Sequence, residues 1–192
     1  MLGGSNSHLE FRMNPIRKAL DIGAIGVVVP MVCTADQVKL VADATRFPPH
    51  GTRSLGAARN TLGGDPLSQE PFCMVMIETV EGMQNLEAIV ATPGVDGVLL
   101  GGADLAVSMG LPKEQIYASS PPPPVVEAME NIVEACRRHG KIAGNAAMDA
   151  SEVEDLLARG IRFNPISAAG LFLISGAKRA LAECRTAVAF TG

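Results

Sequence analysis

Two carboxylates follow apolar segments, in positions where a divalent metal ion could bind. Glu78 closes the continuous apolar run FCMVMIE (72–78), and Asp104 follows GVDGVLLGG (94–102). Such runs are typical of parallel strands buried on both faces, and consecutive strands usually lie side by side, about 4.8 Å apart. Two carboxylates at one sheet edge, completed by water or a chelating substrate, form an oxygen site suited to Mg²⁺ or Mn²⁺. A plainer interpretation stays open, in which Glu78 pairs with an arginine and Asp104 caps the next helix.

The surrounding residues offer further candidates. Gly101-Gly102-Ala103 lies between a strand and a helical turn, where it either holds a small anion with backbone amides or forms only a tight βα turn. Arg53 and Arg59 lie in a loop, where they either face a substrate carboxylate or are solvated. The three histidines lack metal-ligand spacing, and none is expected to act as a general base: His8, His50 and His139. The other residues expected at strand ends are Pro30, Met31, Thr79, Asn145, Asn164 and Pro165.

The elements that must position these residues alternate along the chain. We expect strands at 25–31, 72–78, 94–102, 141–145 and 161–166, with a further short strand at 53–55. Helices are expected at 14–24, 34–47 (with Thr34 as N-cap), 82–91, 103–110, 125–139, 149–159 and 168–185. This alternation indicates βα units on a parallel sheet, either doubly wound or a (β/α)8 barrel. A complete barrel needs at least roughly 200 residues, so a barrel here would be incomplete or trimmed.

Composition restricts the class of protein. The 192 residues are 47% apolar and 19% charged with a net charge of −4, which suits one globular domain. The acidic balance and the lack of a Lys/Arg cluster argue against binding nucleic acid. No apolar run reaches about 18 residues, so no membrane-spanning helix is expected, and residues 1–12 do not resemble a secretory signal. The four cysteines are expected to be buried thiols in a reducing compartment, the cytoplasm: Cys33, Cys73, Cys136 and Cys184.

Two long segments resemble the HpcH/HpaI aldolase family, within the HpcH/HpaI aldolase/citrate lyase superfamily. VVVPMVCTADQVKLVADATRFPPHGTRSLG (27–56) is similar to the family segment in which a strand ends in VPMV, before a helix and a Y/F-P-P-x-G-x-R-x-x-G loop. MIETVEGMQNLEAIVATPGVDGVLLGGADLAVSMG (76–110) is similar to its Q-I-E-T…G-V-D-G…G-P-A-D-L-S…G block. The resemblance extends to about residue 182. The family includes 4-hydroxy-2-oxoheptanedioate and 2-keto-3-deoxyglucarate aldolases and the macrophomate synthase group.

The resemblance implies a fold and an activity. The fold is an α/β TIM (β/α)8 barrel of the phosphoenolpyruvate/pyruvate type that lacks or rearranges its first βα units. It forms a single domain of residues 1–192 with residues 1–12 irregular. The activity is that of a metal-dependent class II aldolase, a carbon–carbon lyase. Such an enzyme cleaves 4-hydroxy-2-oxo acids to pyruvate and an aldehyde through an enolate stabilised by Mg²⁺ or Mn²⁺. The resemblance also implies a homo-oligomer, a hexamer with swapped C-terminal helices.

Site residues follow from the matched motifs. The resemblance assigns Glu78 and Asp104 to the metal, and the backbone amides of Gly102 and Ala103 to the substrate carboxylate. Gly102 stands where the family has proline, a change that keeps the backbone role. Arg12 aligns with the family arginine that stabilises the developing oxyanion.

The histidine that acts as base in the family has no counterpart in this sequence. Two alternatives therefore stay open: a catalytically impaired or pseudoenzyme member of the family, and a lyase of the citrate lyase β type that acts on CoA esters. The second would need a basic surface for the CoA phosphates, which the sequence does not show.

Overall fold

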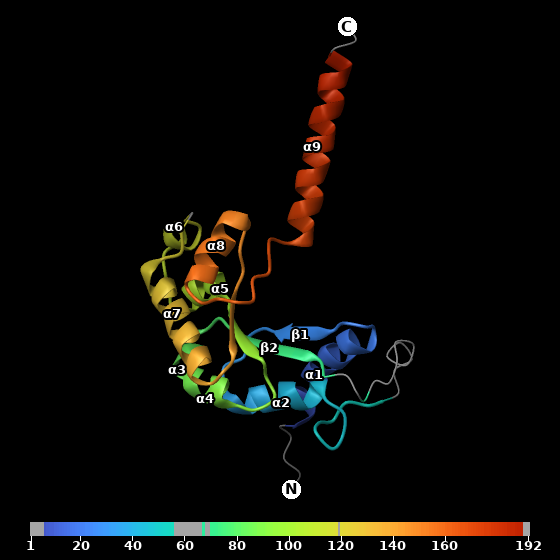
Figure 1. The fold of residues 1–192 in the computed structure, drawn as a ribbon, viewed down its shortest axis with the longest axis vertical. Helices are drawn as coiled ribbons and strands as arrows, with labels where there is room; N and C mark the ends of the chain where they lie inside the picture. The colour runs from blue at the N-terminus through green and yellow to red at the C-terminus, as the bar shows by residue number, and fades with distance from the viewer. Residues whose placement is uncertain (1–5, 56–66, 68–69, 119, 190–192) are drawn as a thin grey trace.

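A computed structural model describes the backbone of residues 6–55, 67, 70–118 and 120–189, and the side chains of 13–55, 67, 70–118 and 120–186. Helices and strands alternate through most of this part of the chain (Figure 1). In chain order they are α1 (Asn6–Asp21), β1 (Gly26–Val29), α2 (Ala35–Thr45), β2 (Phe72–Ile77), α3 (Val80–Gln84), α4 (Leu86–Ala91), β3 (Gly97–Leu100), α5 (Gly102–Ser108), α6 (Lys113–Ile116), α7 (Pro123–Arg138), β4 (Ile142–Asn145), α8 (Ala150–Ala158) and α9 (Ala169–Ala189).

The four strands form one parallel sheet in the order β1-β2-β3-β4. Val29 pairs with Val75, Ile77 with Leu100, and Leu100 with Asn145. This consecutive order is that of a (β/α)8 barrel, because a doubly wound sheet reverses its order at a switch point. Within the described residues the strands make an open sheet and not a closed barrel.

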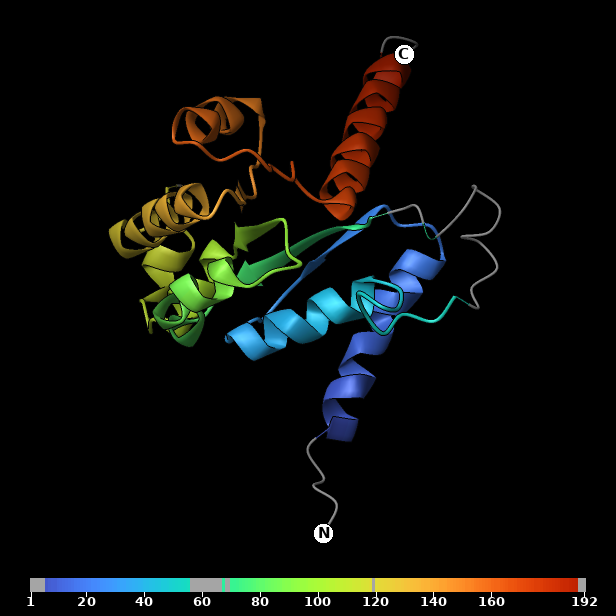
Figure 2. The same ribbon diagram turned by 60° about the horizontal axis from the view of Figure 1, so that its bottom comes forward.

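The side chains of β2 alternate between two faces of the sheet, as the period of a strand requires. Cys73, Val75 and Ile77 belong to the main apolar core, which is shared with α2, α4 and α7. Phe72 and Met74 lie on the other face, where the Phe72 ring packs 5.6 Å from the ring of Phe163. The helices α1, α2 and α4 lie along the first face (Figure 2). Glu78 follows Ile77 and so continues the face opposite these helices.

Several helix boundaries agree with the sequence signals. Thr34 caps α2 in a capping box with Gln37, as its side chain predicts. The PPPP segment leads into α7, which begins with prolines in its first turn, where a missing N–H has no cost. The expected helix at 82–91 is divided at Asn85 into α3 and α4.

Three expectations are wrong. Residues 6–12 are not irregular, because α1 begins at Asn6 and continues through the Asn-Pro pair that suggested a later start. Residues 53–55 form no strand, since the N–H of Arg53 donates to Arg46 O at the end of α2. The segment 161–166 is not a full strand. It makes only isolated parallel bridges, Phe163 with Gly144 of β4 and Ile166 with Ala147, because Pro165 has no N–H to extend a ladder.

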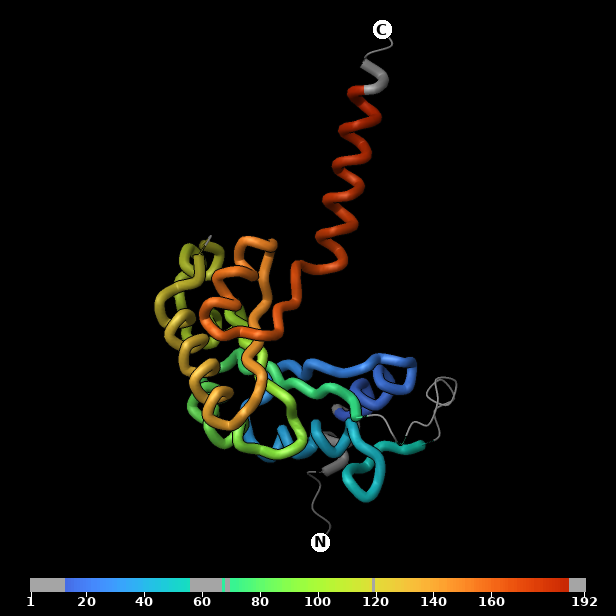
Figure 3. The backbone as a smooth tube through the Cα atoms, in the orientation of Figure 1, coloured from blue at the N-terminus to red at the C-terminus, as the bar shows by residue number. Residues whose placement is uncertain are grey.

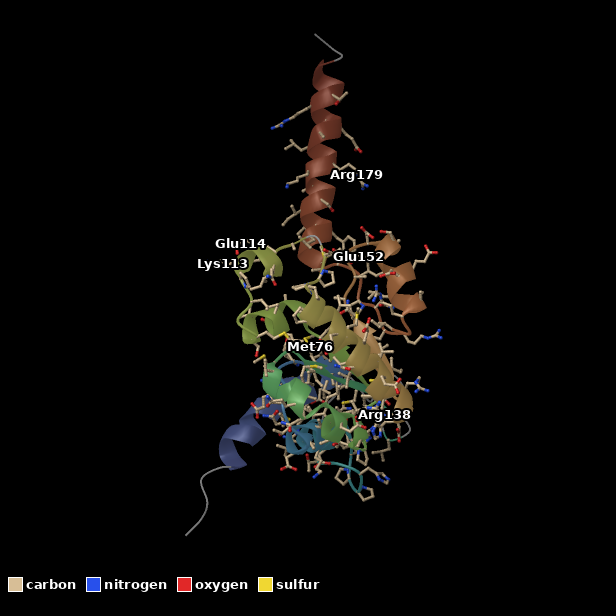
Figure 4. The ribbon with its side chains drawn as sticks, turned by 90° about the vertical axis from the view of Figure 1, so that its left-hand side faces the viewer. Met76, Lys113, Glu114, Arg138, Glu152 and Arg179 are labelled. Atoms are coloured by element: carbon tan, nitrogen blue, oxygen red, sulfur yellow. The ribbon has the colours of Figure 1, made fainter. Side chains whose placement is uncertain are left out.

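The last helix projects away from the body of the molecule. In Figures 1 and 3 α9 rises alone toward the C-terminus, and Figure 4 shows Arg179 far from Met76, which lies within the body. Its apolar side chains are exposed, among them Leu171, Phe172, Leu173 and Ile174. Apolar surface of this extent is usually covered in folded proteins. No described helix has the length and apolar character needed to span a membrane.

The cysteines correct one further expectation. Cys73 and Cys136 are buried, and burial raises the pKa of each thiol to about 11. Cys33 is half-buried and Cys184, on the projecting α9, is exposed. All four are free thiols in this structure, but only two of them are buried, so the expectation that all four are buried is wrong.

Candidate metal and substrate site

The register of the sheet brings Glu78 beside Gly101. Ile77 and Leu100 are paired, and Gly101 N donates to Ile77 O at 3.0 Å. A Cβ built on Gly101 would lie 2.6 Å from both Cβ and Oε2 of Glu78, far inside van der Waals contact. Glycine at this position therefore provides the space that the Glu78 side chain occupies.

Glu78 is a buried carboxylate with one close backbone donor. Its side chain is 4% exposed, and Oε1 accepts a hydrogen bond of 2.6 Å from Met31 N. Burial raises the pKa of Glu78, the Met31 hydrogen bond lowers it, and the charge of Asp104 raises it again. No ion pair joins Glu78 to an arginine or lysine within the described side chains. The negative charge of Glu78 is therefore not compensated by a protein cation in this part of the chain.

Asp104 lies on the first turn of α5, exposed and close enough to Glu78 to hydrogen-bond with it. The N-cap of α5 is Gly101, and no side chain caps this helix. Neither half of the plainer interpretation is therefore found, because Glu78 has no arginine partner in the described region and Asp104 does not cap α5. The structure instead brings the two carboxylates together, as their spacing predicted.

This pair fits a divalent cation. A buried carboxylate with a raised pKa beside a second carboxylate is stabilised by added positive charge. Oxygen ligands suit Mg²⁺ and Mn²⁺, which commonly keep water or substrate in their remaining positions. Among the described residues no group of three or more His, Cys, Asp and Glu side chains could hold a metal ion, so Glu78 and Asp104 would supply only part of a coordination shell.

The other candidate residues divide into two groups. Gly102 and Ala103 lie at the start of α5 beside the carboxylate pair, where the N–H groups of the first turn have no acceptor inside the helix. The backbone of Arg12 belongs to α1, but its side chain lies outside the described residues, as does all of Arg59. Arg53 is neither solvated nor near the pair, because it is 4% exposed and bonded to Asp21 at 2.9 Å.

The two histidines with described side chains lie away from the pair. His139 caps the C-terminus of α7, ahead of β4, and contacts Glu87 Oε1 at 2.7 Å. This places it toward the opposite end of the sheet from Glu78. His50 is exposed in the loop after α2. The expectation that neither acts as a general base is consistent with these positions.

Two residues shape the site through contacts that were not predicted from the sequence. Met31 was expected only as a residue at a strand end, and Gly101 as part of a tight turn or of a backbone anion site, not as the space for Glu78. The contact of Met31 depends on a backbone conformation that its residue type does not indicate. The contact between Gly101 and Glu78 could have been predicted, because a glycine beside a candidate carboxylate on the neighbouring strand indicates that a side chain approaches the backbone closely.

The fold and site together define a class of protein: a parallel α/β domain with an acidic pair at the carboxyl ends of neighbouring strands. Comparison with known proteins gives the family. The sequence model of the HpcH/HpaI aldolase/citrate lyase family matches residues 6–175, and the chain belongs to this family.

Individual relatives agree with this assignment. The chain is 36% identical over 163 residues to a 2-keto-3-deoxy-L-rhamnonate aldolase of Klebsiella pneumoniae, covering 81% of this chain and 59% of the relative. It is 39% identical over 157 residues to a hydroxypyruvate/pyruvate aldolase of Cupriavidus necator, covering 77% and 56%. The crystal structure of an HpcH/HpaI aldolase from Desulfitobacterium hafniense superposes with a TM-score of 0.76 at 26% identity, covering 90% and 68%. The chain thus spans less than two thirds of the two curated relatives.

Proposed function

We propose that this chain is a divalent-metal-dependent aldolase, a carbon–carbon lyase that cleaves 4-hydroxy-2-oxo acids to pyruvate and an aldehyde. The observation that carries the proposal is the pairing of buried Glu78 with Asp104 at the carboxyl ends of β2 and β3. The names of the two curated relatives support a 2-oxo acid of the pyruvate or hydroxypyruvate type. The proposed cation is Mg²⁺ or Mn²⁺.

In this proposal each candidate site residue has a defined role. Glu78 and Asp104 hold the cation, and the backbone amides of Gly102 and Ala103 hold the substrate carboxylate beside it. The bound cation supplies Lewis-acid stabilisation of the negative charge that develops on the 2-oxo group. As the C3–C4 bond breaks, the 4-hydroxyl loses its proton to become the aldehyde and C3 gains a proton to give pyruvate. Arg12 is proposed, from the resemblance, to stabilise the oxyanion.

A pyruvate-release assay tests this function. The substrates are 2-keto-3-deoxy-L-rhamnonate, a 4-hydroxy-2-oxo diacid and oxaloacetate, each with Mn²⁺, Mg²⁺ or EDTA. We expect metal-dependent turnover that falls by at least about 100-fold in Glu78→Gln, because that change removes a charged ligand. Glu114→Gln, the same chemical change at an exposed position of α6, should retain full activity. Turnover that is unchanged by EDTA or by Glu78→Gln would contradict the proposal.

A second candidate function is a catalytically impaired family member. It is favoured by the position of His50 and His139, neither of which lies at the carboxylate pair. Such a protein would bind Mn²⁺ and pyruvate without turnover, so calorimetric titration with both ligands separates it from the active enzyme.

We also propose that the chain forms a homo-oligomer, with a hexamer as the number of subunits implied by the resemblance. The exposed apolar side chains of the projecting α9 support association, and light scattering measures the number of subunits. The free cysteines support the cytoplasm as the proposed location.

A further inference from the structure

Met31 has a backbone conformation that its residue type disfavours. Its φ is +58°, in the left-handed region, and Ser167 is the one other described residue besides glycine with a positive φ. Asn, Asp and Gly adopt this region readily, whereas an unbranched apolar residue does so at a cost. Strain of this kind persists only where surrounding contacts impose it, and it gathers at functional sites.

The left-handed turn directs one N–H group at Glu78. Pro30 has no N–H, and the N–H of Val32 donates to Met76 O of β2 at 3.3 Å, as in ordinary strand pairing. Only the N–H between them, that of Met31, turns away from the backbone of β2. It donates instead to Glu78 Oε1 at 2.6 Å, a short hydrogen bond to a charged acceptor.

Side chains from the following elements hold this turn in place. Cys33 N donates to Gln37 Oε1 of α2 at 2.7 Å, and Cys33 O accepts from Asn85 Nδ2 at 2.9 Å. The Cys33 thiol lies 3.1 Å from the hydroxyl of Thr79, the residue next to Glu78. The segment that carries Met31 is therefore fixed from both sides, which explains how the strained conformation is maintained.

Glu78 thus lies between two backbone constraints. Met31 N holds Oε1 from the β1 side, and the missing side chain of Gly101 leaves space for Oε2 on the β3 side. The side chain of Met31 is 54% exposed, so its contribution to Glu78 comes from the backbone and not from apolar packing.

We infer that the left-handed backbone of Met31 is a positioning device that fixes the orientation of the Glu78 carboxylate for the metal. This inference rests on the proposed function, in which Glu78 is a metal ligand. Met31 itself touches neither the metal nor the reacting atoms in this account. Its conformation, and not its side chain, is the property that matters.

Substitutions that separate conformation from side chain test the inference. Met31→Gly and Met31→Asn keep the N–H and favour the left-handed region, whereas Met31→Val resists it. The measurement is the Kd for Mn²⁺ by isothermal titration calorimetry on the metal-free full chain. We expect Kd within about 3-fold of wild type for Gly and Asn, and weaker by about 10-fold or more for Val, as is typical for groups that orient metal ligands.

Ser167→Val is the matched control. Ser167 has nearly the same φ, +57°, and donates its N–H to Ala147 O on the far side of β4 from Glu78. The substitution imposes the same backbone penalty, so it should lower Tm without changing the Kd for Mn²⁺. A change in Kd equal to that of Met31→Val would attribute both effects to general strain and overturn the inference.

The outcomes distinguish this inference from the proposed function. If wild type binds no Mn²⁺, or if Glu78→Gln binds it equally well, the metal role of Glu78 fails and the inference falls with it. If wild type binds through Glu78 but Met31→Gly loses more than about 10-fold in affinity, the side chain is required and the positioning role of the backbone is wrong. This last outcome can be measured on Met31→Gly alone, because glycine relieves the strain and the variant is expected to fold.

Discussion

Glu78 and Glu87 are nine residues apart in the sequence, yet the structure places them in opposite electrostatic surroundings. Glu87, on α4, is exposed and contacts Arg138 and His139 at 2.7 Å each, and these hydrogen bonds lower its pKa. Glu78, at the end of β2, is buried beside Asp104, and burial raises its pKa. The charge of Glu87 is compensated by Arg138, whereas Glu78 has no cationic partner among the described side chains.

The comparison separates an ion-paired carboxylate from the carboxylate that we propose as a metal ligand. The contact of Glu87 joins α4 to the C-terminal end of α7, on the surface where Figure 4 shows Arg138. Exposed pairs of this kind contribute little to stability because water screens them. Among the described residues, the surroundings of Glu78 disfavour its charge, and a position that lowers stability in this way is characteristic of a site shaped for function.

Outside the two proposed metal ligands, the largest effect is expected for Gly101→Ala. The new Cβ would lie 2.6 Å from Glu78 Oε2 and 3.2 Å from Met76 Sδ, so the carboxylate must move. We expect the Kd for Mn²⁺ to weaken by about 10–100-fold. Overpacking of about 1–3 kcal/mol should lower Tm by several degrees.

Gly176→Ala on α9 is the control for Gly101→Ala, because nothing lies within 4 Å of its added Cβ. It should leave the Kd unchanged and leave Tm equal or slightly higher, since alanine favours a helix over glycine. If Gly101→Ala binds Mn²⁺ as wild type does, Glu78 does not depend on this close contact.

A smaller effect is expected for Glu87→Gln, which removes the compensated carboxylate. Because the pKa of Glu87 is lowered in the folded state, its stabilisation is present above the ordinary value of 4.5 and is lost as the pH falls through the lowered value. Thermal unfolding of the variant should therefore show a small decrease in Tm at pH 7 that disappears at acid pH. Mn²⁺ affinity should not change, and a loss of affinity would remove the distinction between the two carboxylates.

Much of the sheet and the carboxylate pair could be predicted from the sequence. The apolar runs before Glu78 and after Pro93 gave β2 and β3, and the parallel arrangement then brought Glu78 and Asp104 to one edge. The strand at 161–166 was overestimated because Pro165, near the end of the segment, has no N–H to donate to a ladder. The start of α1 was misplaced because Asn14-Pro15 resembles a helix start, although the helix continues through it.

The fine geometry of the site could not be predicted in the same way. A methionine gives no sign of a positive φ, since that conformation depends on contacts from Gln37, Asn85 and Glu78, all of which lie later in the chain. The burial of Arg53 against Asp21 was also missed, because β1 and α2 separate the two residues in the sequence and neither residue type gives a pairing signal. Contacts between separate elements, and not local propensity, decided both cases.

The most direct test of the central claim is the thermal stability of wild type and Glu78→Gln, each in EDTA and in Mn²⁺ at pH 7.5. The raised pKa of Glu78 means that its ionised form destabilises the metal-free fold at this pH. In EDTA the Gln variant should therefore melt higher, by roughly 2–4 °C for each 1 kcal/mol relieved. This difference should shrink at acid pH, where wild-type Glu78 is protonated.

Mn²⁺ should reverse the order of the two proteins. A ligand that binds only the folded state raises Tm, so wild type should gain stability with increasing Mn²⁺ while Glu78→Gln should not. Crossing of the two Tm values is the result the account predicts. A variant that melts lower than wild type in EDTA, together with an equal response of both proteins to Mn²⁺, would show that Glu78 is a structural carboxylate and not a metal ligand.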